Sequence, residues 1–220
     1  MKLENLKKLV ERSVFFKVEE VLPNVFNVRF KNQKDLCSTF VRLQEYYESP
    51  NFRNKIFSLE EFHNWYSKQH KGKFTYLKDW TGFNIPSNVA KEVNKKFSLN
   101  KREKQLISVF KRKKKPYYVI GTFGSKKDYK SVLKHEIAHA MYHNNLSYKK
   151  EINKILKDIN KKKLFKFLEK LGYHKKVWLD EAHAFILTEY EDLISSKVNI
   201  SKKHKKSIDE TFEKYLKKVA

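Results

Sequence analysis

Alternating apolar and polar positions predict a β-hairpin near the start of the chain. The stretches 14–21 and 25–30 are rich in β-branched and aromatic residues, and a Pro-Asn pair lies between them. Apolar residues at helical spacing then predict a helix over 35–47, which ends at a Ser-Pro pair. The first part of the chain therefore combines strands with helices.

A capping pattern predicts the start of the next helix. Ser58 and Glu61 form the Ser-x-x-Glu motif, in which each side chain accepts a hydrogen bond from the other residue's backbone N–H, and Gly72 is expected to end the helix. The aromatic, turn-rich stretch 74–86 predicts a strand followed by a loop. Two further helical stretches cover residues 88–97 and 101–110.

The run PYYVIGTF at 116–123 is the clearest strand, because β-branched and aromatic residues dominate it. Helical periodicity follows over 129–143, 148–171 and 177–194, and a Lys-rich amphipathic helix closes the chain. The whole pattern predicts an α+β fold with a small mixed sheet and a helix-rich C-terminal half.

Composition limits the class of protein. The 220 residues are 40% hydrophobic and 15% aromatic, which is enough for a packed core and excludes a wholly disordered chain. The single cysteine, Cys37, excludes an internal disulfide framework and a Cys-rich zinc finger, and it favours a reducing, cytoplasmic location. No apolar run approaches the ~20 residues that span a bilayer, so we expect no membrane contact, and the charged, amphipathic start differs from a secretory signal.

Positive charge is the most unusual property of the composition. The formal net charge is +24, and the stretch 91–115 alone holds eleven basic and two acidic residues. Only six of the 49 basic residues are arginines, the residue type best suited to bidentate contacts with phosphate and guanine. We therefore expect nonspecific contact of a Lys-rich surface with nucleic acid or another polyanion, and we disfavour a dedicated nucleic-acid function. A compositional bias of the genome explains the charge equally well.

Candidate chemistry lies in the helix that follows the clearest strand. His135, Glu136 and His139 form the pattern HExxH. Residues four apart share one face of a helix, so both imidazoles can bind one cation, while Glu136, turned by ~100°, can touch a water on that cation. The neighbouring residues are small or apolar, which indicates a buried helix in which these polar groups need partners. The motif predicts a Zn²⁺ site.

A third ligand has to come from outside this motif. His143 continues the spacing, but eight residues of helix rise ~12 Å, too far for His135 and His143 to share an ion. Glu181 is the preferred candidate, since small residues beside it would let its helix approach the HExxH helix. The alternatives for this ligand are Asp180, His183 and His174.

A strand, an HExxH helix and a downstream Glu-Ala-x-Ala helix together resemble the gluzincin branch of the zincin metallopeptidases, over about residues 116–194. The resemblance implies a zincin-like fold in which the small mixed sheet packs against the HExxH helix. It also implies His135, His139 and Glu181 as zinc ligands and Glu136 as the catalytic base.

One position departs from this family. Thermolysin-like members carry Asp four residues after the ligand Glu, where this chain has Phe185. The groups that orient the ligand histidines must therefore be arranged differently, and Asp180 is the candidate to accept a hydrogen bond from a ligand histidine N–H.

The activity expected from this site is hydrolysis of peptide bonds in a protein or peptide substrate, by a zinc-activated water with Glu136 as the general base. Residues 116–220 would form the catalytic region, and residues 1–115 an N-terminal α+β region of unknown role packed on it. The strand 117–123 is expected at a sheet edge, where it would align an extended substrate. Candidate donors to the oxyanion are Tyr173, His174, His183 and Tyr190.

Two other functions are compatible with the sequence. One is a basic, nucleic-acid-associated protein that uses a zincin fold near DNA or RNA. The other is a non-catalytic scaffold that binds zinc for folding, which the presence of Glu136 disfavours. A purely structural zinc would also normally have four protein ligands.

Overall fold

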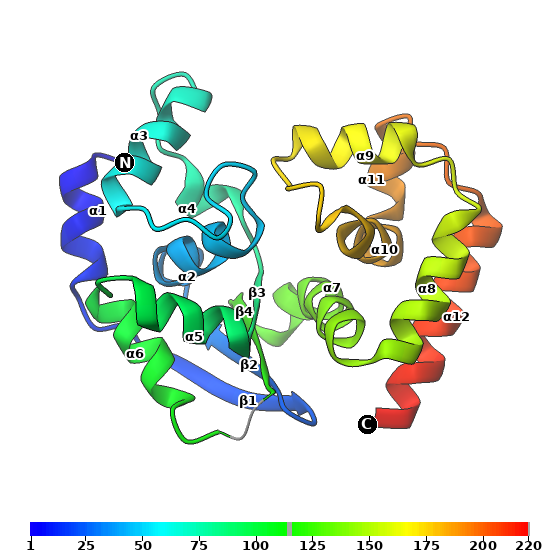
Figure 1. Cartoon of the computed structure of the whole chain (residues 1–220), viewed down its shortest axis with the longest axis horizontal. Helices are drawn as coiled ribbons and strands as arrows, with labels where there is room; N and C mark the ends of the chain where they lie inside the picture. The colour runs from blue at the N-terminus through cyan, green and yellow to red at the C-terminus, as the bar shows by residue number, and fades with distance from the viewer. Residues whose placement is uncertain (114–115, 220) are drawn as a thin grey trace. The chain divides into compact units, whose positions relative to one another are not determined.

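The computed structural model describes residues 1–113 and 116–219, without the side chains of 126–128 (Figure 1). The chain divides into two compact units. The first comprises Met1–Tyr47 and Asn51–Tyr129, and the second comprises Glu48–Pro50 and Lys130–Ala220. Within the basic stretch 91–115, Lys114 and Lys115 lie outside the described residues.

Among the residues described, the first unit contains one mixed sheet of four strands. Its order is β1 (Phe16–Leu22), β2 (Val25–Phe30), β4 (Tyr118–Phe123) and β3 (Phe83–Pro86). β1 and β2 are antiparallel, which confirms the predicted hairpin, and Asn24 in its turn has a φ of 61°.

Strand β4 lies inside this sheet. It pairs parallel with β2 and antiparallel with β3, so hydrogen bonds occupy both of its sides. The expectation that strand 117–123 forms a sheet edge is therefore wrong. A substrate cannot be held by strand addition to β4.

Helix α2 (Gln33–Glu48) packs on the sheet where β4 has a glycine. A Cβ added at Gly121 would lie 2.7 Å from Leu36 Cδ1 and 2.9 Å from Phe40 Cε2, so the missing side chain allows this close approach. Phe40 also stacks on Phe83 of β3, with ring centroids 5.4 Å apart. These buried residues form part of the core of the first unit.

The other helices of the first unit are α1 (Leu3–Val10), α3 (Leu59–Gln69), α4 (Tyr76–Asp79), α5 (Ser87–Lys96) and α6 (Lys101–Val109). The predicted capping box between Ser58 and Glu61 is present at the start of α3. The prediction for 74–86 is wrong in its order, because helix α4 precedes strand β3. Tyr76, in this helical turn, is fully buried despite the β propensity of tyrosine.

The second unit consists mainly of helices. In chain order they are α7 (Lys126–Asn144, of which residues from Lys130 belong to this unit), α8 (Leu146–Lys157), α9 (Lys161–Lys170), α10 (Trp178–Thr188), α11 (Tyr190–Ser195) and α12 (Lys202–Val219). Helix α10 contacts α8, α9, α11 and α12 and so occupies a central place in this unit (Figure 1). The single helix predicted over 177–194 is wrong, because the chain leaves helical geometry at Glu189, with a φ of −119°.

The architecture confirms an α+β chain with a small mixed sheet and a helix-rich C-terminal part. The predicted packing of the sheet against the HExxH helix stays a prediction, as does the division at residue 115. Within the described part of the chain, none of the helices has both the length and the apolar character required to cross a bilayer.

Candidate metal centre

Helix α7 positions two imidazoles side by side. His135 and His139 are one turn apart, and their ring centroids are separated by 4.8 Å. The helix is buried around them, as its small and apolar neighbours predicted: Ala138 and Ala140 are fully buried. Glu136 follows His135 on the same helix and is only 5% exposed.

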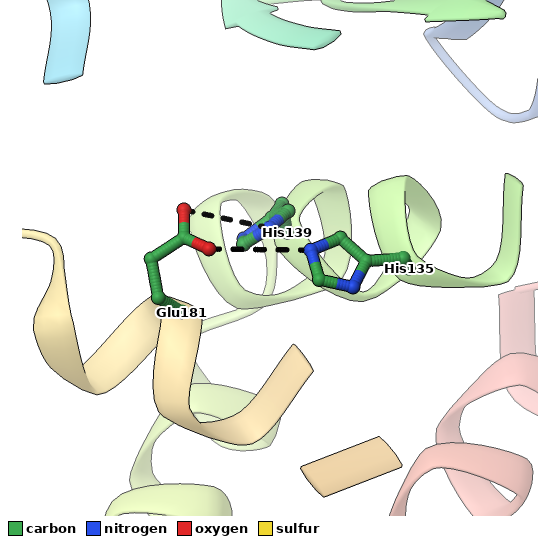
Figure 2. A group of neighbouring side chains, drawn as sticks. All are labelled: His135, His139 and Glu181. Atoms are coloured by element: carbon green, nitrogen blue, oxygen red, sulfur yellow. Dashed lines mark ion pairs between the residues drawn. The ribbon is translucent and has the colours of Figure 1, made fainter. Parts of the chain in front are cut away.

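Glu181 of α10 meets both imidazoles (Figure 2). Its Oε2 lies 4.0 Å from His135 Nε2, and its Oε1 lies 3.7 Å from His139 Nε2. The ligand atoms of the three residues all lie within 4.8 Å of one another. Ligands bound at about 2.1 Å in a tetrahedron are roughly 3.4 Å apart. The three ligand atoms would therefore have to move closer together to bind one ion. The structure thus brings together the three residues selected from the sequence.

The Glu181 carboxylate is a buried group with an unused oxygen. The residue is 1% exposed, and Oε2 has no hydrogen-bond partner in the described part of the chain. Burying such an oxygen without a partner is costly, and a coordinated cation would provide one. Two imidazole nitrogens and one carboxylate oxygen are a donor set typical of zinc. The residues present therefore fit this ion.

Asp180 orients one of the two imidazoles. Its Oδ1 lies 2.8 Å from His139 Nδ1 and accepts the N–H of that nitrogen, which leaves Nε2 free to face Glu181. This confirms the contact predicted for Asp180. Burial raises the pKa of Asp180, but the charge of His139 and its hydrogen bond outweigh burial and hold the pKa below its ordinary value.

Residues at the C-terminal end of α10 hold the other imidazole, that of His135. His135 Nδ1 lies 2.8 Å from Thr188 Oγ1 and 3.0 Å from Glu189 Oε2. Phe185, at the position where the family has Asp, packs edge-on against His135 with ring centroids 5.3 Å apart. Neither Thr188 nor Glu189 was predicted from the sequence as a contact of His135. Thr188 lies seven residues after Glu181, on the same helix face, and that spacing was a usable signal.

Buried carboxylates dominate the electrostatics of the site. Burial raises the pKa of Glu181 to about 7, although His139 and His135 lower it. Glu48, the last residue of α2 and by its contacts part of the second unit, has a pKa raised well above its ordinary value by burial and by the charge of Glu181. Burial lowers the pKa of His139, but the charges of Asp180 and Glu181 outweigh it and raise the pKa well above its ordinary value. Without a metal, the site therefore retains protons that a divalent cation would replace.

Several residues proposed from the sequence lie outside this group or have other contacts. The Tyr190 hydroxyl donates to a backbone carbonyl 2.8 Å away, and His183 stacks on Tyr142 with ring centroids 4.9 Å apart. The backbone N–H of His174 donates to a carbonyl 3.1 Å away. His143 is not a member of the group, as its distance along the helix predicted.

Comparisons with protein-family models, with curated proteins and with solved structures give no match to this chain. Function is therefore inferred from the site itself. The site offers two imidazoles, each hydrogen-bonded through Nδ1 to residues of the segment 180–189, together with the carboxylate of Glu181 that faces them and a further buried glutamate, Glu136.

Proposed function

We propose that this protein is a zinc-dependent peptidase that acts on a protein or peptide substrate. The observation that carries the proposal is that Glu181, from a separate helix, faces the Nε2 atoms of both histidines of the HExxH motif at 3.7 and 4.0 Å. A carboxylate in this place completes a set of zinc ligands, and the charge of Glu136, the residue after His135, acts on it. The resemblance to gluzincins in the order of these residues gives the same assignment.

Each residue of the site has a defined part in peptide hydrolysis. His135, His139 and Glu181 would hold a zinc ion, which would act there as a Lewis acid on a peptide carbonyl and would lower the pKa of a water. Glu136 takes a proton from the attacking water and delivers it to the leaving amine. Asp180 and Glu189 accept hydrogen bonds from the Nδ1 atoms, which keeps both Nε2 atoms directed at the ion.

Tyr173 is our choice for the donor to the oxyanion that forms on the substrate. Burial raises the pKa of Tyr173 well above its ordinary value, and the charges of Glu181 and Glu48 raise it further. The phenol therefore keeps its proton at neutral pH and stays a hydrogen-bond donor. The charges of Glu181 and Glu48 act on the Tyr173 phenol, which indicates that this side chain lies near the metal centre, whereas the Tyr190 hydroxyl donates to the backbone oxygen of Ile200.

The number of ligands supports an enzyme over a zinc scaffold. A structural zinc site normally has four protein ligands, whereas the group found in the described part of the chain has three. A scaffold also has no use for the carboxylate of Glu136 beside the ion. We place the activity in the cytoplasm, because the one cysteine, Cys37, is a buried free thiol.

Digestion of a peptide library by the zinc-loaded full chain tests this function. The Glu136→Gln variant should keep the zinc content of the wild type and lose about 10²- to 10⁴-fold in cleavage rate. Glu191→Gln, an exposed glutamate on α11, is the matched control and should cleave like the wild type. Zinc-loaded wild type that cleaves no peptide, or a Glu136→Gln variant as active as the wild type, would overturn the proposal.

A further inference from the structure

A cavity of about 800 Å³ opens in the first unit and contains none of the metal-centre residues. Its lining comes from the start of α1, the first turn of α2, helices α3 and α4 and the segment that joins them. This volume is typical of sites for small organic molecules. We call it the basic cavity.

The charged residues that line the basic cavity are all lysines. They are Lys2, Lys34, Lys73 and Lys78, and each is exposed. No aspartate or glutamate lines the cavity, and none of the four lysines forms an ion pair within the part of the chain that the structure describes. Their positive charge therefore gathers at one place, while a carboxylate behind the lining, that of Asp79, accepts a hydrogen bond from Thr75 at 2.6 Å.

Two other cavities indicate that the Lys-rich composition alone does not produce this pattern. The cavity beside α8 and α12 has three acidic residues in its lining, Glu151, Asp158 and Glu210, together with two lysines. A third cavity, near α1 and α6, is lined by Glu11 together with two basic residues, Lys7 and Arg42. Acidic residues thus line both of these cavities but are missing from the basic one.

Apolar residues form the remaining wall of the basic cavity. Leu3, Phe74 and Leu77 line it, and Phe74 and Leu77 are buried. His63 stacks on Phe74 with ring centroids 4.5 Å apart, and its Nε2 lies 2.9 Å from the backbone oxygen of Met1. These contacts fix the wall between the start of α1 and the segment before α4, so the cavity is formed before any ligand enters.

The turn after α3 presents one of the lysines. Lys71 and Gly72 have φ values of 53° and 78°, and the N–H of Gly72 donates to Ser67 O at 2.8 Å. This left-handed turn ends the helix and directs the chain to Lys73 at the cavity. Lys73 therefore follows directly on a hydrogen-bonded turn.

We propose that the basic cavity binds a small organic anion that joins an apolar or aromatic body to a phosphate, carboxylate or sulfonate group. The apolar wall takes the body of the ligand, and the lysines surround its charged group. The proposal gives the first unit a ligand-binding role, and it does not depend on the peptidase activity.

Titration of the full chain with 8-anilinonaphthalene-1-sulfonate tests the proposal, because this fluorescent probe combines an aromatic body with a sulfonate. We expect saturable binding of one probe molecule per chain, weakened by added salt. Removing three lysines with Lys34→Ala, Lys73→Ala and Lys78→Ala should weaken binding at least about tenfold. The matched control removes three exposed lysines outside the cavity, with Lys17→Ala, Lys31→Ala and Lys55→Ala, and should change affinity less than about twofold. Equal weakening by both triple variants would overturn the proposal, since it would indicate attraction by overall charge.

Two further measurements locate the ligand and identify its chemistry. Leu3→Trp narrows the cavity without changing charge and should abolish probe binding, whereas unchanged binding would place the probe elsewhere and overturn the proposal. Displacement of the probe by adenosine 5′-monophosphate but not adenosine would support a nucleoside phosphate, and displacement by decanoate but not decanol would support an acyl anion. Equal displacement by the neutral partners would contradict an anion site. Circular dichroism of each variant verifies that it is folded.

Discussion

His139 Nδ1 lies 2.8 Å from Asp180 Oδ1, so the residue that precedes Glu181 on α10 sets the orientation of an imidazole on α7. One turn of α10 thereby supplies both Glu181, the proposed third ligand, and the group that aligns His139, another proposed ligand. Removal of Asp180 should disturb the metal centre without removing any ligand atom.

The Asp180→Ala variant is expected to bind zinc about 10- to 100-fold more weakly than the wild type, the range found when hydrogen-bond partners of ligand histidines are removed. Competition with a chelator of known affinity measures this change. Asp192→Ala, at an exposed position of α11, is the matched control. Wild-type affinity in the Asp180 variant would show that the contact does not orient His139.

Removal of the Glu189 side chain should lower zinc affinity less than removal of the Asp180 side chain. His135 Nδ1 lies 3.0 Å from Glu189 Oε2 but also 2.8 Å from Thr188 Oγ1, so a second acceptor is at hand when the carboxylate is removed. We expect Glu189→Ala to lower zinc affinity by less than about tenfold, and the double variant with Thr188→Val to lower it further. A loss from Glu189→Ala that equals or exceeds the loss from Asp180→Ala would contradict this ranking.

The pH dependence of zinc binding follows from the raised pKa values. The pKa of Glu181 rises from 4.5 to about 7 in the folded chain, and the pKa of His139 is also raised. Raised pKa values add stability to the metal-free protein at low pH, and this stability is lost as the pH rises, for Glu181 between about 4.5 and 7. A metal replaces these protons, so the stabilisation by zinc should grow from pH 5 to 8.

Thermal unfolding with and without zinc at several pH values measures this trend. The shift in melting temperature on adding zinc should increase with pH in the wild type and stay near zero in His139→Ala. A shift that is constant from pH 5 to 8 would mean that zinc binding does not displace protons from these groups.

A test of the fold concerns the first unit. In Gly121→Ala the new Cβ would meet Leu36 and Phe40, both fully buried, at 2.7–3.0 Å. Such overpacking should lower the free energy of unfolding by about 1–3 kcal/mol. Chemical denaturation measures the loss, and zinc content per folded chain should stay at the wild-type value. Unchanged stability would indicate that α2 does not press on β4 at this position.

The sequence predicted those features that depend on local patterns. The hairpin, the capping box at Ser58 and the pairing of His135 with His139 all follow from spacing within one element. The position of Glu181 against both imidazoles was predicted from the chemistry of zinc ligands together with the resemblance, and the structure places the three side chains together. Their binding of zinc stays a prediction.

Features that depend on contacts between elements could not be predicted in the same way. The place of β4 inside the sheet is decided by its pairing with two strands that are distant in the sequence. The helix break at Glu189 interrupts an apolar pattern that reads as continuous helix, and it brings this carboxylate to His135. The strand β3 at the end of the stretch 74–86 is defined by its pairing with β4, a contact that local propensity does not reveal.

The central claim is that one zinc ion is bound by two histidines of α7 and by Glu181 of α10. Elemental analysis of purified wild type and Glu181→Ala, with Glu191→Ala as the control for loss of an exposed glutamate, tests it most directly. We predict one zinc per chain in the wild type and the control, and much less than one in Glu181→Ala after dialysis against a weak chelator. One zinc per chain in the dialysed Glu181→Ala variant would contradict the claim.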